Sequence, residues 1–166
     1  MSWRAGDLET LRALRPARDA AVRWIDEYGD RDGDGDGFVE YERRSPGGLQ
    51  NQGWKDPHDS VVHADGSLVE GPIALVEVQG YVYLAKLPIA DVSDALGAPE
   101  VAAHLRDQAQ ALRTRFNDAF WNPDEGTFAV ALDGNKRQVA SVTSNPAIVC
   151  TAGSSIPTRR AQWPSG

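Results

Sequence analysis

The chain has 166 residues, of which 41% are hydrophobic and 25% are charged, an ordinary composition for about one folded domain. The formal net charge of −7 argues against a nucleic-acid partner, because the sequence has no basic stripe that could replace phosphate counterions. No apolar run is long enough for a signal-peptide core or a membrane span, and the single cysteine, Cys150, suits a reducing cytoplasm.

Residues 7–28 predict a pair of helices. Asp7 can cap a short helix that ends at Leu14, and Pro16 is typical of the start of a second helix that ends before Gly29. The apolar residues of the second segment recur at helical spacing: Ala17, Ala20, Ala21, Trp24, Ile25 and Tyr28. We therefore expect a helical hairpin.

The next segment is rich in carboxylates that alternate with arginine or glycine: Asp30, Asp32, Asp34 and Asp36. If Asp32 is the first ligand of a calcium loop, Gly37 and Val39 fall at the expected positions, but the twelfth residue is Arg43. Counting from Asp30 places Tyr41 there, and neither residue can replace the bidentate glutamate. We therefore expect no metal ion, but a tight Asp/Gly turn that leads into a strand over 38–41.

A polar loop follows at residues 47–59. Gly47, Gly48, Gly53 and Pro57 exclude a regular helix or a central strand. The loop combines an indole, two amides, an ammonium group and two carboxylates: Trp54, Asn51, Gln52, Lys55, Asp56 and Asp59. An indole face can stack on a pyranose ring, while the polar groups bind hydroxyls or exchange a proton. The alternative is a solvated loop whose tryptophan is buried for packing.

Residues 73–87 allow two structures. Val76, Val78 and Val82 alternate with polar residues as in a strand, whereas Pro72 is typical of a helix start. An inner helix of an α/α barrel would also be apolar on nearly all sides and would carry Glu77 and Gln79 towards a cavity. Glu77 is then either a buried structural hydrogen-bonding group or a substrate contact.

The following segments predict a short helix over 89–96, a long helix that Pro99 starts, and a hairpin over 126–139 that turns at Asp133-Gly134. The apolar stripe of the long helix contains Val101, Leu105, Ala109, Leu112, Phe116 and Phe120. His104 lies off this stripe, on an expected solvated face. Residues 147–166 have no periodicity, so we expect a tail that is disordered or out of frame.

Three ordered motifs together resemble bacterial glycogen-debranching (amylo-alpha-1,6-glucosidase) proteins: Asp34–Tyr41, Gly48–Asp56 and Pro72–Tyr81. The catalytic domain of those proteins belongs with the mannosylglycerate-hydrolase-like six-hairpin glycosidases. The resemblance implies a mainly α fold, a partial (α/α)6 six-hairpin toroid over residues 1–146, with short strands and hairpins in its loops. It also favours the helix over 73–87.

The resemblance further implies an inverting hydrolase that acts on α-glucan in the cytoplasm without a cofactor. Asp56 would be the general acid, with Asp59 as the second choice, and burial against Trp54 would have to raise the pKa of Asp56 while Lys55 would lower it. The implied substrate-binding residues are Tyr41, Asn51, Gln52, Trp54, Lys55, Glu77 and Gln79. No residue matches the family's catalytic base. The alternatives are an inactive carbohydrate-binding remnant and a related glycosidase for glycosylglycerate or trehalose.

Overall fold

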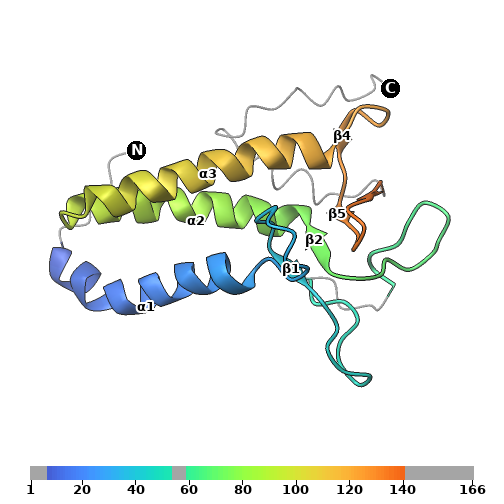
Figure 1. Cartoon of the computed structure of the whole chain (residues 1–166), viewed down its shortest axis with the longest axis horizontal. Coiled ribbons are helices and arrows are strands. Elements are labelled where there is room, and N and C mark those ends of the chain that lie inside the picture. The colour runs from blue at the N-terminus through green and yellow to red at the C-terminus, as the bar shows by residue number, and fades with distance from the viewer. Residues whose placement is uncertain (1–6, 54–58, 141–166) are drawn as a thin grey trace.

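A computed structural model describes residues 7–53 and 59–140 of the chain. In this part of the chain, three long helices lie side by side, and short strands gather at one end of them (Figure 1). The elements in chain order are α1 (Leu8–Tyr28), β1 (Glu40–Tyr41), β2 (Ile73–Leu75), α2 (Val76–Ala95), α3 (Pro99–Phe120), β3 (Trp121–Asn122), β4 (Thr127–Phe128), β5 (Ala131–Leu132) and β6 (Gln138–Val139).

The expected hairpin over 7–28 is wrong, because α1 is one continuous helix. Asp7 caps it as predicted, since its Oδ1 accepts a hydrogen bond from the Thr10 N–H at 2.9 Å. Pro16 lies inside the helix, where it removes a single backbone hydrogen bond, and the first turns lie at an angle to the rest (Figure 1). No residue of α1 is buried, and Leu14, Trp24 and Tyr28 are each more than half exposed.

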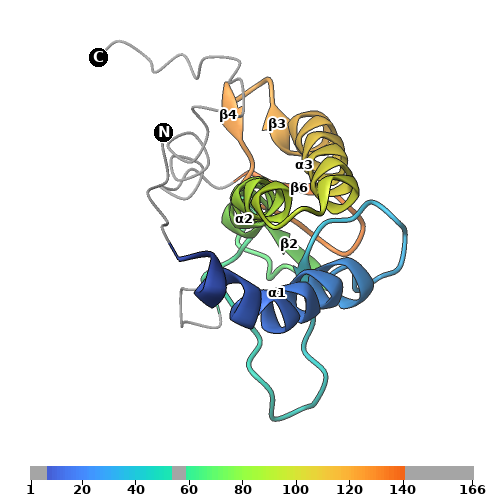
Figure 2. The same ribbon diagram turned by 90° about the vertical axis from the view of Figure 1, so that its left-hand side faces the viewer.

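The run after Pro72 combines both of the structures that the sequence allowed. Ile73–Leu75 is a strand, and the helix that the resemblance favours begins at Val76, whose N–H donates to the Val130 carbonyl at 3.0 Å. α2 then continues through Pro88 to Ala95, so the expected separate helix over 89–96 is wrong. Nine residues of α2 are buried, because α3 and the sheet cover it on several sides (Figure 2).

The long helix α3 spans Pro99–Phe120, as predicted. Its buried stripe contains Ala102, Leu105, Ala109, Leu112, Phe116 and Phe120, whereas Val101 is 43% exposed, so that position was assigned wrongly. His104 is exposed, as expected. The rings of Phe116 and Phe120 stack at 4.7 Å between centroids, and Phe38 packs edge-on against Phe120 at 5.3 Å. These aromatic contacts join α3 to the segment before β1.

The sheet contains four antiparallel strands in the order β1-β2-β5-β6, with Tyr41 opposite Ile73 and Leu75 opposite Ala131. The turn at Asp133 is confirmed, but the first half of the expected hairpin over 126–139 is divided into two strands, because β4 pairs with β3 and β5 pairs with β2 and β6. At Gly71 an added Cβ would lie 2.7 Å from the Gly134 Cα, so these two backbones approach closely only because both residues are glycines.

The described residues are therefore mainly helical with a small sheet, in agreement with the predicted class. Their three helices do not by themselves make a toroid. None of the described helices is both long and apolar enough to cross a membrane.

Candidate functional site

The predicted site residues come from three elements that meet beside the sheet. Tyr41 ends β1, Asn51 and Gln52 precede the segment 54–58, and Glu77 and Gln79 lie in the first turns of α2. Trp54, Lys55 and Asp56 lie outside the described residues. The structure therefore describes the residues before and after this segment in the chain.

Asn51 is 7% exposed and holds the loop to the sheet. Its Oδ1 accepts hydrogen bonds from the Tyr41 hydroxyl and from the Gly53 N–H, each at 3.0 Å, and its Nδ2 donates to the Ser60 hydroxyl. An added Cβ at Gly53 would lie 2.7 Å from Leu75 Cδ1, so the Leu75 side chain would have to shift to admit one. Asn51 thus links Gly53 to Ser60, which lie before and after segment 54–58 in the chain. Sequence analysis did not predict this contact of Ser60.

Glu77 and Tyr41 form the electrostatic part of the site. Glu77 is 2% exposed and lies in the first turn of α2, where a carboxylate interacts favourably with the helix dipole. Burial, and then the negative charge of Glu77, raise the pKa of Tyr41 to about 12. Tyr41 therefore keeps its proton at any ordinary pH and presents a hydroxyl group that can both donate and accept.

Gln79 has a structural role in this geometry. Its Oε1 accepts from the Val39 N–H at 2.9 Å, and its Nε2 donates to the carbonyls of Val39 and Leu75 at 2.8 and 3.1 Å. With 1% exposure, Gln79 would have to break these bonds before it could contact a sugar.

The remaining predicted residues face solvent. Gln52 is exposed and uses its Nε2 to donate to the Glu42 carbonyl at 3.0 Å, which leaves its Oε1 available to a ligand. Asp59, the second choice for the acid, is also exposed.

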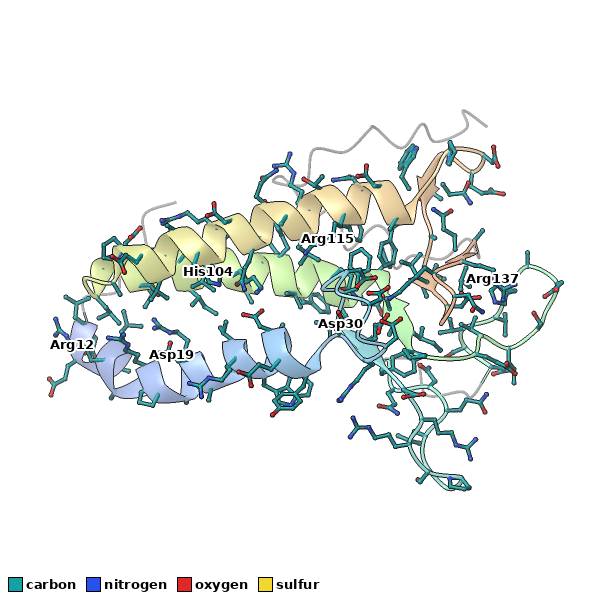
Figure 3. All side chains as sticks on the ribbon, in the orientation of Figure 1. Arg12, Asp19, Asp30, His104, Arg115 and Arg137 are labelled. Atoms are coloured by element: carbon teal, nitrogen blue, oxygen red, sulfur yellow. The ribbon has the colours of Figure 1, made fainter. Side chains whose placement is uncertain are left out.

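Sequence analysis did not predict the Lys136 cluster, which joins the Asp/Gly segment 30–37 to the β5–β6 turn. The Lys136 ammonium lies between the carboxylates of Asp32, Asp34, Asp36 and Glu40. Burial raises the pKa of Glu40, and Lys136 opposes this shift. Figure 3 labels Asp30, where α1 leads into this segment, and Arg137, beside Lys136 in the turn. No local pattern reveals a pairing across about a hundred residues.

A cavity of about 350 Å³ lies between the three helices and the Asp/Gly segment, away from Tyr41 and Asn51. Its buried cation is Lys86, whose Nζ lies 2.5 Å from Asp26 Oδ1 and 2.8 Å from Gln108 Oε1. Gln108 also donates to Asp26 at 3.1 Å, so the three groups satisfy one another. We take this network to join α1 to α2 and α3, not to bind a substrate.

A few buried polar groups that converge beside a polar loop are typical of a small-molecule binding site. The comparison with protein families agrees, since the model of the mannosylglycerate hydrolase MGH1-like glycoside hydrolase domain matches residues 3–163. The chain belongs to this glycoside hydrolase family, so its expected substrate is a carbohydrate. A search of curated proteins found no match.

Proposed function

We propose that the chain is part of the (α/α)6 toroid of an inverting glycoside hydrolase that acts on α-glucan, of the glycogen-debranching amylo-alpha-1,6-glucosidase type. The observation that carries the proposal is the cluster of the half-buried Tyr41 with the buried Asn51 and Glu77, in a chain of a glycoside hydrolase family. The three resembling motifs supply the preference for α-glucan. The single cysteine supports a cytoplasmic location.

In this proposal the carboxyl group of Asp56 donates its proton to the glycosidic oxygen as the bond from that oxygen to the anomeric carbon breaks. Water attacks the anomeric carbon from the opposite face and loses a proton to a second carboxylate, about 6.5–9.5 Å from the first. The family carries this base on the later half of its barrel. We assign it to no residue of this chain.

The flanking residues would bind and orient the sugar. Trp54 offers a stacking face, Lys55 and Gln52 bind hydroxyls, and the Tyr41 hydroxyl can accept from a sugar while it donates to Asn51. The Glu77 carboxylate would accept a hydrogen bond from a sugar hydroxyl, or it would hold Tyr41 in place. Gln79 acts through its bonds to Val39, as a positioning residue.

A second candidate substrate is a glycosylglycerate, which the description of the matching family favours. Trehalose is an alternative for the same architecture. A catalytically inactive remnant that binds α-glucan is the non-enzymatic alternative.

A substrate panel separates these possibilities. The 166-residue chain and a complete catalytic domain that contains it are each incubated with α-1,6-branched glucan, trehalose and mannosylglycerate, and NMR records the released sugar and its anomeric configuration. We expect the complete domain to cleave the branched glucan with inversion, and the chain alone to show no turnover, because it lacks the base.

If the complete domain cleaves only mannosylglycerate or only trehalose, that compound is the substrate and the assignment of α-glucan is wrong. Retention of the anomeric configuration would contradict the inverting mechanism. If the complete domain binds glucan in affinity electrophoresis but cleaves nothing, the protein is the catalytically inactive remnant that binds α-glucan.

A further inference from the structure

The carboxylates of the Asp/Gly segment converge on one cation that a distant element supplies. Lys136 Nζ lies 2.8 Å from Asp36 Oδ2, 3.0 Å from Asp32 Oδ2 and 3.4 Å from Asp34 Oδ2, and it also contacts Glu40 Oε1. Lys136 belongs to the turn between β5 and β6, and β2 separates these two strands from β1 in the sheet. One ammonium group therefore lies among four carboxylates.

The opposite oxygens of the same carboxylates hold the backbone of the segment. Asp32 Oδ1 accepts from the Asp34 N–H, Asp34 Oδ1 accepts from the Asp36 N–H, and Asp36 Oδ1 accepts from the Phe38 N–H, at 3.2, 2.8 and 2.7 Å. Each aspartate thus has one oxygen on the backbone and one directed at the cation. This is how the first half of a calcium-binding loop uses its aspartates.

The residue that would complete a calcium loop is occupied elsewhere. Arg43, at the twelfth position, is exposed and donates from Nε to the Ser45 carbonyl at 2.9 Å. The carboxylate oxygens of Asp30, Asp32 and Asp34 lie within 4.8 Å of one another. Asp30, however, uses both of its oxygens on the N–H groups of Gly33 and Gly35. The chain itself supplies the positive charge that this arrangement requires.

The backbone gives independent support for a dedicated role of Lys136. Among the described residues other than glycine, only Lys136 has a positive φ, of 59°. Glycine and asparagine are the usual residues in this left-handed conformation, because a side chain is unfavourable there. A lysine at this position of the turn indicates that its ammonium group is needed.

We propose that Lys136 is the built-in cation of the 30–40 loop, holding it in the arrangement that a metal ion imposes on a calcium loop and making it independent of divalent metals. Because Glu40 precedes Tyr41 in β1, the same contact positions Tyr41. This last consequence for sugar binding rests on the proposed function. The role of Lys136 as the cation of the loop does not.

A change in the sign of the effect of one substitution on the melting temperature tests the proposal without any enzyme assay. In the native chain Asp34→Asn should lower the melting temperature, because it removes a carboxylate that faces Lys136. In a Lys136→Ala background the same substitution should raise the melting temperature, because it relieves repulsion among carboxylates that have lost their cation. A packing role for the lysine side chain predicts no change of sign, and an unchanged sign would overturn the proposal.

Calcium titration provides the second test and uses CaCl2 itself as the probe. Millimolar calcium should leave the melting temperatures of the native chain and of Lys136→Arg unchanged, but should restore several of the degrees that Lys136→Ala loses. Arg137→Ala is the matched control, since Arg137 lies on the same turn but pairs with Asp133, and it should not respond to calcium.

Submillimolar calcium binding to the native chain, abolished by Asp34→Ala, would show that the loop is a metal site and would overturn the proposal. A Lys136→Ala chain that is destabilised but does not respond to calcium would also contradict it. If Lys136→Ala does not fold, Lys136→Gln with and without Asp34→Asn gives the same sign comparison.

Discussion

Tyr41 is the residue of the candidate site whose ionisation the structure specifies. Its hydroxyl donates to Asn51 Oδ1, and burial together with Glu77 raises its pKa to about 12. Its folded-state pKa is thus above the unfolded value of 10.0. Stability from the protonated form is therefore fully present below pH 10 and is lost as the pH rises through about 12.

We predict that a Tyr41→Phe chain is less stable at neutral pH by about 0.5–1.5 kcal/mol, the usual contribution of one hydrogen bond. It should also lose less stability than the native chain in strongly alkaline solution, since the group that ionises is absent. Denaturant unfolding at a series of pH values measures both effects. Tyr28→Phe, at an exposed residue of α1, is the control. Equal alkaline losses in native and Tyr41→Phe chains would show that Tyr41 is not buried as described.

The contact between α2 and Val39, the residue before β1, depends on the side chain of Gln79. Gln79→Leu keeps most of the volume but leaves the N–H and C=O groups of the half-buried Val39 without their side-chain partners. We expect a loss of about 2–4 kcal/mol in the free energy of unfolding, because each unsatisfied buried group costs about 1–3 kcal/mol. Chemical denaturation measures it.

Gln110→Leu is the matched control, because Gln110 lies on an exposed position of α3. Its expected change is within about 0.5 kcal/mol. If both substitutions have the same small effect, the Gln79 amide does not hold Val39 in place.

Element by element, the sequence predicted what local patterns encode. The periodicity of residues 99–120 and the Asp7 cap each depend on neighbours within four residues, and both are confirmed. Pro16 was wrongly taken as the start of a second helix, because a proline inside a helix removes only one backbone hydrogen bond and α1 continues through it. The helix expected over 89–96 is likewise the end of α2, which continues through Pro88. The strand Ile73–Leu75 depends on pairing with β1 and β5, which no local pattern shows.

The same distinction applies to the candidate site. The polar composition of residues 47–59 indicated a site, and the structure brings Tyr41, Asn51 and Glu77 together beside it. The sequence did not reveal that Gln79 is used by the backbone, or that Lys136 holds the acidic segment. Both depend on partners at least 40 residues away.

For the whole molecule, the described helices present one face without a partner. α1 has no buried residue, and its Leu14, Trp24 and Tyr28 are 56%, 51% and 54% exposed. In the toroid that we propose, further helices of the ring would cover this face. Membership of the glycoside hydrolase family is shown, whereas the ring, the substrate and the acid remain proposals.

The measurement that tests the central claim most directly is the dependence of Asp56→Asn on the leaving group, in a complete domain that supplies the base. Asparagine keeps the shape of aspartate but cannot donate a proton. Hydrolysis of α-1,6-branched glucan should therefore fall by about 10²–10⁴-fold. An α-glucosyl fluoride or nitrophenyl glucoside needs little protonation, so its cleavage should fall much less. Asp59→Asn should affect neither substrate strongly. Equal losses on both substrates, or the leaving-group dependence in Asp59→Asn in place of Asp56→Asn, would contradict the assignment of Asp56 as the general acid.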